Sequence, residues 1–419
     1  MINRTQQPAI SQVKEIHFVA PETRKINGSI PVYLMRDVQN ETSRLDLYFD
    51  AGKNSGDKGI SSFVNGLLLS GTPDRNSVEI NEAIDSLGGF FQSGVSMENA
   101  VISMYALREF LPEIMNGLTD ALKNVHFDEK ETTEYLADRK QKHLQSMGKV
   151  SYLSQREFQK HLFQSNELYA SVMELEDLEN VSRKDLIDFH QKHYLNGLQK
   201  VVLVGDFSDQ EIDQILTLLE GFSDKNLSQK DADISHEKGR FHVSKEGALQ
   251  TAVRVGRILF NKKHEDYLDF LVLNTILGDY FGSRLMSNIR EDKGYTYGIG
   301  SMVNEFENTG YFMIGTEVKK EVTEDTLVEI KFELDRLQNE LVNEGELELV
   351  KNYLLGQLLK SADGPYAMMD LYLSADMQGK DLEYYNDAMA AVRKINPERI
   401  QQLARLYLNW DDLTVVTAG

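Results

Sequence analysis

The chain has 419 residues, which suggests two or three domains, and it has no cysteine, so neither disulfides nor thiolate metal ligands are available. A hydrophobic share of 41% and a charged share of 26% are typical of an ordinary globular protein. The net charge of −21 argues against nucleic acid as a partner, because backbone phosphates would be repelled.

The N-terminal stretch has no apolar segment of the kind that a secretory signal needs, and the chain has no run of about 18 apolar residues. The sequence therefore predicts no signal peptide, no transmembrane helix and no membrane partner. A cytoplasmic location is the expectation.

Strands and helices are interspersed along both halves of the chain. In the first half we expect two strands within 28–50 around a polar turn at Asn40-Glu41, helices at 60–69 and 77–87, a hairpin within 90–106, helices within 107–147, at 153–164 and at 182–194, a strand at 200–204 and a helix at 208–222. In the second half we expect a strand at 251–255, a helix at 265–278, strands at 295–303 and 309–317, helices within 323–361, at 366–377 and after Asn396-Pro397, and a final strand at 413–417.

The two halves resemble each other. Tyr194-Leu195-Asn196 precedes one predicted strand and Tyr407-Leu408-Asn409 precedes another, 213 residues later. In the same order, the helix with Asn65 matches the helix with Asn274 at an offset of 209. The sequence thus predicts an α+β protein of two homologous domains, each a mostly antiparallel sheet flanked by helices. The expected ranges are 1–222 and 246–419, joined by a polar linker at 223–245.

The stretch from Gly278 to Ser301 carries the strongest candidate site. Phe281, Leu285 and Ile289 have helical spacing, Lys293-Gly294 ends the helix, and 295–299 favours a strand. Arg290 and Tyr297 could then offer a guanidinium and a phenol to one peptide carbonyl or carboxylate. Alternatively, the arginine pairs locally and the tyrosine only packs.

The pattern SRL..NIRE.KG..Y in this stretch, with KGISSFVNGLLLSGT, SLGGFFQSGVSMENAVISMYAL and HYLNGLQKVVLVGDF in the first half, resembles the pitrilysin/insulinase family of zinc peptidases. The match covers essentially the whole chain and is nearest to the mitochondrial-processing-peptidase-like subgroup. The resemblance implies a clamshell of two domains. It also implies catalytic and substrate-binding roles for Arg290 and Tyr297, which would reach across the cleft toward a peptide at the zinc.

The chain departs from the family at the zinc motif, His-x-x-Glu-His. The matching positions hold Ser62, Asn65 and Gly66, and the downstream glutamate ligand would fall near Gln141. Serine and glycine cannot replace imidazole ligands, and asparagine cannot act as a general base. We therefore expect this chain to bind no zinc, with the metal carried by a partner chain.

No other motif supplies a substitute site. His190 and His193 have ligand-like spacing, but no carboxylate accompanies them, so solvated or capping histidines are the better prediction. The chain has no nucleophile elbow, P-loop or dinucleotide fingerprint.

A chain with the Arg/Tyr pair and without the zinc motif resembles the non-zinc subunit of the two-chain enzymes of this family. The expected function is that of a heterodimer partner in a zinc endopeptidase acting on peptides. Two alternatives remain: a non-catalytic scaffold or peptide-binding protein of the same fold, and a self-sufficient peptidase with an unrecognised metal site.

Overall fold

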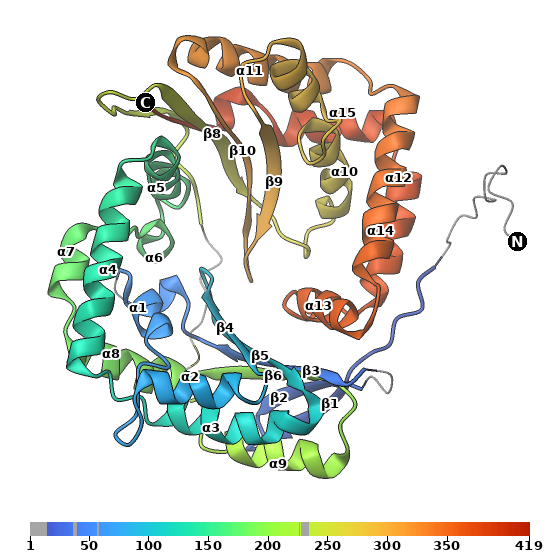
Figure 1. The fold of residues 1–419 in the computed structure, drawn as a ribbon. Helices are drawn as coiled ribbons and strands as arrows, with labels where there is room; N and C mark the ends of the chain where they lie inside the picture. The colour runs from blue at the N-terminus through green and yellow to red at the C-terminus, as the bar shows by residue number, and fades with distance from the viewer. Residues whose placement is uncertain (1–14, 37–39, 57, 226, 228–233) are drawn as a thin grey trace, which may run out of the picture.

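Two mostly antiparallel sheets, one from each half of the chain, face each other across the molecule (Figure 1). The computed structural model describes residues 15–36, 40–56, 58–225, 227 and 234–419. The first sheet has the strand order β1-β2-β6-β3-β5-β4 and the second the order β7-β11-β8-β10-β9.

The first half contains β1 (Glu22–Ile26), β2 (Ile30–Met35), β3 (Thr42–Phe49), α1 (Ile60–Gly66), α2 (Ser77–Asp85), β4 (Phe90–Val95), β5 (Ala100–Leu107), α3 (Leu111–Lys123), α4 (Glu129–Met147), α5 (Val150–Leu162), α6 (Glu167–Ala170), α7 (Leu175–Asn180), α8 (Arg183–His190), the π-helix η3 (Gln191–Leu195), β6 (Leu198–Val204) and α9 (Asp209–Leu219). The second half contains β7 (Gly239–Val243), β8 (Gln250–Leu259), α10 (Tyr267–Leu277), the π-helix η4 (Met286–Asp292), β9 (Ile299–Glu305), β10 (Gly310–Lys319), α11 (Thr323–Asn339), α12 (Glu344–Ser361), α13 (Pro365–Asp376), α14 (Glu383–Lys394), α15 (Pro397–Tyr407) and β11 (Thr414–Ala418).

The predicted fold class and duplication are confirmed. In each sheet one pair of strands is parallel, β2 with β6 and β7 with β11, and the other pairs are antiparallel. The order β2-β6-β3-β5-β4 repeats as β7-β11-β8-β10-β9, so corresponding strands occupy corresponding places. Each half also has its own large apolar core between its sheet and its helices.

Each half lends one helix to the other. Helix α5 packs on β8 and β11 of the second sheet, where Phe158 and Leu162 join Met313 and Val416 in one buried cluster. Helix α13 lies, in turn, against the first sheet, where Met369 and its neighbours meet strands β2 and β6. The two helices occupy equivalent places in the repeat. The exchange joins the halves on both sides of the space between the sheets (Figure 1).

A third contact joins the halves at two hairpin turns. Glu98, between β4 and β5, accepts a hydrogen bond from the backbone N–H of Glu307, between β9 and β10, at 2.8 Å. Its other carboxylate oxygen accepts one from the Tyr169 hydroxyl at 2.5 Å. Because Glu98 is buried, these donors compensate its lost hydration.

Some predicted boundaries were wrong and some elements were missed. Strand β9 begins at Ile299 and not at 295. Before it the chain forms a turn, in which the Thr296 hydroxyl bonds to the backbone of Gly298 and Glu317. Residues Gly239–Val243, inside the range predicted as a linker, form the edge strand β7, while 226 and 228–233 lie outside the described residues. Helix α14 was missed, although Tyr385, Met389 and Val392 have helical spacing.

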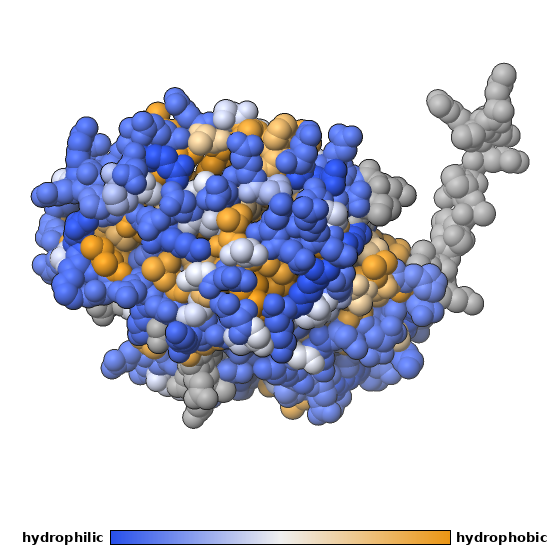
Figure 2. Space-filling view, turned by 90° about the horizontal axis from the view of Figure 1, so that it is seen from below, coloured by the Kyte–Doolittle hydropathy of each residue, from blue (hydrophilic) through white to orange (hydrophobic). Residues whose placement is uncertain are grey.

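The surface agrees with the high net charge. The face turned toward the viewer in Figure 2 is mostly hydrophilic, with hydrophobic side chains in small, scattered groups. Across the residues that the structure describes, no helix combines the length and apolar character needed to cross a bilayer.

Candidate functional site

Helix α1 carries the positions of the lost zinc motif, and a tyrosine from α4 fills the space beside them. The hydroxyl of Tyr135 donates to the backbone carbonyl of Ser62 at 3.2 Å. A Cβ atom added to Gly66 would lie 2.1 Å from that hydroxyl oxygen, so the glycine is what leaves room for the ring. Asn65 is buried and donates to the Tyr194 hydroxyl at 3.1 Å. These contacts make the region a packed junction of neutral groups.

These residues do not fit a zinc ion. Ser62 contributes its carbonyl to a tyrosine, Asn65 contributes its amide, and Gly66 has no side chain. Gln141, near which the third ligand position was expected, is exposed, whereas Tyr135 of α4 contacts α1. Among the described residues, no group of three or more His, Cys, Asp and Glu side chains is placed to hold a metal ion.

The two histidines with ligand-like spacing serve different partners. His190 Nε2 lies 2.9 Å from the carbonyl oxygen of Leu122, and His193 Nδ1 lies 2.6 Å from that of Asp50. Both rings are buried, so the histidines are not solvated. The alternative prediction, a capping histidine, holds for His190, because Leu122 lies in the last turn of α3. Burial lowers the pKa of His190 to about 4.

The second sheet turns a face of small residues toward the space between the halves. Pairing places Arg254 of β8, Gly315 of β10 and Gly300 of β9 in one row across three strands. The neighbouring positions on the same face include Ala252 and Gly298. The opposite face carries the large buried side chains of the second core. The missing side chains leave a shallow floor on the inner face.

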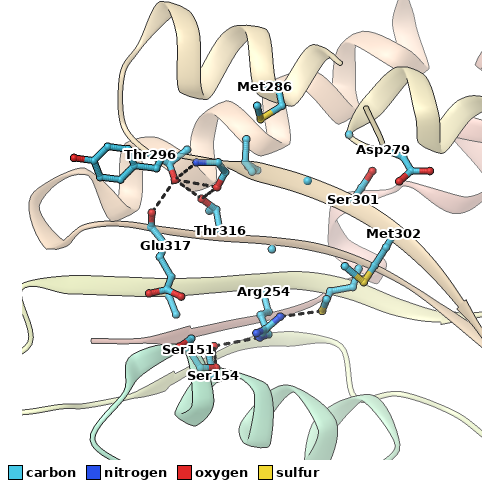
Figure 3. A pocket seen from close by; sticks show the side chains of 18 of the residues that line it. Ser151, Ser154, Arg254, Asp279, Met286, Thr296, Ser301, Met302, Thr316 and Glu317 are labelled. Atoms are coloured by element: carbon cyan, nitrogen blue, oxygen red, sulfur yellow. Dashed lines mark hydrogen bonds between the residues drawn. The ribbon is translucent and has the colours of Figure 1, made fainter. Parts of the chain in front are cut away.

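A cavity of about 810 Å³ lies over this floor. The first turn of α5 forms one wall through Ser151 and Ser154 (Figure 3). The segments before and after η4 contribute Phe281 and Tyr297. The cavity is therefore lined by both halves of the chain, and it includes one of the two predicted site residues.

Tyr297 stands at this cavity on a braced turn. Its side chain is 96% exposed, and its neighbour Thr296 ties the turn to β10. The Thr296 hydroxyl accepts from the N–H of Gly298 at 3.1 Å and from the Thr316 hydroxyl at 2.9 Å, and donates to the carbonyl of Glu317 at 2.8 Å (Figure 3). The backbone is thus fixed while the phenol stays accessible. Tyr295, by contrast, packs against the second core.

Arg290 lies on the π-helix η4, which ends before Gly294, a glycine with φ of +67°. The predicted helix end is therefore confirmed, and the positive φ explains the choice of glycine. The guanidinium carbon lies 4.8 Å from the centre of the Phe281 ring and 3.7 Å separates the guanidinium from the Glu291 carboxylate. Single turns of π-helix occur often at functional sites.

Phe281 contacts Arg290 and lines the same cavity as Tyr297. Phe281 has helical spacing with Leu285 and Ile289, but whereas these two are buried, Phe281 is 67% exposed and lines the cavity with Tyr297. Its ring holds the Arg290 guanidinium by a cation–π contact. Arg290 itself is not among the cavity-lining residues, so in this structure the phenol is presented to the cavity and the guanidinium is held at its edge.

Sequence reasoning missed Tyr135, Phe281 and Arg254 as members of these sites. Tyr135 could have been found from the helical position that faces α1, since a large residue must fill the space that Gly66 leaves. Arg254 gives no signal in the sequence, because only strand pairing shows that it lies over Gly315.

Comparison with known proteins agrees with this architecture. Residues 32–174 match the model of the insulinase family, peptidase M16, and residues 180–354 match the model described as the peptidase M16 inactive domain. An uncharacterized zinc protease of Rickettsia felis is 25% identical over 318 residues, 74% of this chain and 76% of that protein. The uncharacterized zinc protease YmxG of Bacillus subtilis is 23% identical over 358 residues, 83% and 85% of the two chains.

Solved structures share the whole fold. A protein of Pseudomonas fluorescens described as a peptidase M16 inactive domain superposes with a TM-score of 0.84 at 22% identity, covering 96% of this chain and 98% of that one. A protease from Helicobacter pylori gives a TM-score of 0.83 at 16% identity, with 96% and 100% covered. Models of this family match both halves of the chain, and the two-domain fold is shared with its solved structures. The chain therefore belongs to the insulinase family, peptidase M16.

Proposed function

We propose that this chain is the zinc-free partner subunit of a two-chain zinc endopeptidase. One observation carries the proposal: the lost zinc positions on α1 are packed with Tyr135, while Tyr297 remains almost fully exposed at a cavity lined by both halves. A protein under no demand for chemistry would have little reason to expose a phenol on a turn braced by Thr296.

In the proposed pair, the homologous chain supplies the zinc and the general base. Tyr297 would donate a hydrogen bond near the scissile carbonyl, where negative charge develops. Arg290 would hold the peptide backbone or a carboxylate with its planar donors, and the Phe281 ring would keep the guanidinium in place when no peptide is bound. Nothing in hydrolysis requires the metal and the oxyanion donors to come from one chain.

Mixing the purified chain with a zinc-bearing homologue tests the proposal. We expect endopeptidase activity that neither chain has alone, and a loss of roughly 10- to 1000-fold when Arg290 is changed to alanine. Arg240→Ala is the matched control, because Arg240 is an exposed arginine that pairs with Glu324 outside the cavity. Equal loss in both variants would contradict the assigned role.

A non-catalytic scaffold or peptide-binding protein is the second candidate. The exposed Tyr297 beside a cavity also suits peptide binding without hydrolysis. Peptide retention by the isolated chain, without activity in any pairing, would favour this candidate. Stoichiometric zinc and activity in the isolated chain would instead support a self-sufficient peptidase.

A further inference from the structure

Arg254 is a half-buried cation that has no acidic partner among the described residues. Its Nε donates to the Ser154 hydroxyl at 3.2 Å, and its Nη1 approaches the Met313 sulfur at 3.4 Å. Both acceptors are neutral, and the Nη2 donors have no acceptor in the described part of the chain. Burial lowers the pKa of this guanidinium. Most half-buried arginines of the chain, such as Arg284 with Glu346, form an ion pair instead.

The guanidinium is directed into the cavity and not into the core. A Cβ atom added to Gly315 would lie 3.5 Å from Nη1, so the group extends over a strand position that has no side chain. Ser151 and Ser154 of α5 lie beside it in the cavity wall (Figure 3). Gln250 also lines the cavity, and all three are neutral hydrogen-bonding residues. An open floor, neutral hydroxyl and amide groups on the wall nearest Arg254, and a free donor edge suit a small anionic group.

The acidic residues of the cavity form no ion pair with this guanidinium in the described part of the chain. Glu317 is exposed and lies one row along the sheet, opposite Ala252, from where it attracts Arg254 electrostatically without contacting it. Asp279 lies beside Ser301, on the other side of the cavity (Figure 3). The first turn of α5 adds the partial positive charge of a helix N-terminus near Ser151, and that helix has no side-chain cap.

We propose that Arg254 is a carboxylate-binding subsite, which takes an acidic side chain or the C-terminal carboxylate of a peptide held in this cavity. Tyr297 and Arg254 line the same cavity, so one peptide can reach both. This proposal rests on the proposed function, because it specifies which class of peptide that function would act on. The chain would then select peptides by their negative charge, in addition to contributing the Tyr297 hydroxyl.

Peptide selection by the isolated full-length chain tests the subsite. A randomised pool of N-acetylated octapeptides is passed over immobilised protein in two forms, free C-terminal acids and C-terminal amides, and the retained peptides are sequenced. We expect roughly 10-fold enrichment of carboxylate-bearing peptides, lost in Arg254→Gln and kept in part by Arg254→Lys. The acid and amide pools distinguish a C-terminal carboxylate from Asp or Glu side chains.

Arg257→Gln is the matched control. Arg257 is on the same strand and half-buried, but its guanidinium donates to the carbonyl of Tyr407. Enrichment that persists in Arg254→Gln, that disappears equally in Arg257→Gln, or that is absent in the unaltered chain would overturn the subsite. If Arg254→Gln does not fold, Ser151→Asp, which places a carboxylate in the same wall, must abolish the enrichment for the proposal to stand.

The test separates the subsite from the proposed function, because no zinc-bearing chain is present. Enrichment without activity in any pairing would keep the subsite and refute the endopeptidase role. If an assembled pair cleaves acidic and neutral peptides equally well, the endopeptidase role stands and the subsite is refuted.

Discussion

At the scale of single residues, the positions on α1 that depart from the zinc motif are the most informative. Their side chains exclude zinc binding and also permit a different packing. Gly66 permits the Tyr135 ring to occupy the position beside α1, and Asn65 turns its amide to Tyr194. The loss of the zinc motif is predictable from the sequence, because serine and glycine stand in place of the two imidazole ligands and asparagine in place of the general-base carboxylate. It could not predict that a tyrosine closes the space, since this depends on how α4 rotates against α1.

Gly66→Ala should destabilise the chain by about 1–3 kcal/mol, because the added methyl group overlaps the Tyr135 hydroxyl. Urea unfolding measures the loss. Combining the change with Tyr135→Leu should recover part of the stability, since the overlapping atoms are then removed. An unaltered midpoint in Gly66→Ala would show that the ring is not packed as described.

His190 should make stability depend on pH. Its pKa of about 4 in the folded chain lies below the ordinary value of 6.5, so the unfolded chain binds more protons between these values. Stability is therefore fully present above pH 6.5 and is lost as the pH falls toward 4, by about 3 kcal/mol at most.

Urea midpoints measured from pH 7 to pH 4 check this dependence. His190→Gln should flatten the curve, whereas His126→Gln, at an exposed histidine, should leave it unchanged. An equally steep curve in both variants would assign the effect to other groups.

At the scale of elements, the repeat was predictable and the exchange of helices was not. The matching Tyr-Leu-Asn segments and the Asn65/Asn274 helices predict two like domains. Nothing in the periodicity of 150–162 or 365–376 shows that each helix packs on the sheet of the other half, because an apolar face does not specify its partner. The boundary error at β9 has the same origin, since the Thr296 hydrogen bonds depend on residues of β10.

Met369→Ala tests the contact of α13 with the first sheet. Met369 is fully buried among Met35, Val202 and Val204, so its truncation should cost about 2–5 kcal/mol. The same contact also holds the halves together, and limited proteolysis between them should become faster. Leu349→Ala, at an exposed leucine of α12, is the control. A loss below about 0.5 kcal/mol would mean that α13 contributes little to this junction.

At the scale of the whole molecule, the two duplicated domains contribute different structural parts. The first half contributes a packed α1 and the helix α5 that walls the cavity, and the second contributes the floor, Tyr297 and Arg290. Among the described residues, the contacts that join the halves include α5 on the second sheet, α13 on the first, and Glu98 between Tyr169 and Glu307. Ile16 and Phe18 add a further contact with α14. The cavity therefore exists only when the two halves are assembled as they are here.

The proposed role of Tyr297 is to act on a peptide bound at the zinc of a partner chain. Its most direct test is the kcat of the assembled pair carrying Tyr297→Phe, which removes one hydroxyl from a side chain that makes no packing contact in the core. We predict a fall in kcat of roughly 10- to 1000-fold, with the pair still assembled and KM little changed. A kcat equal to that of the unaltered pair would contradict the account.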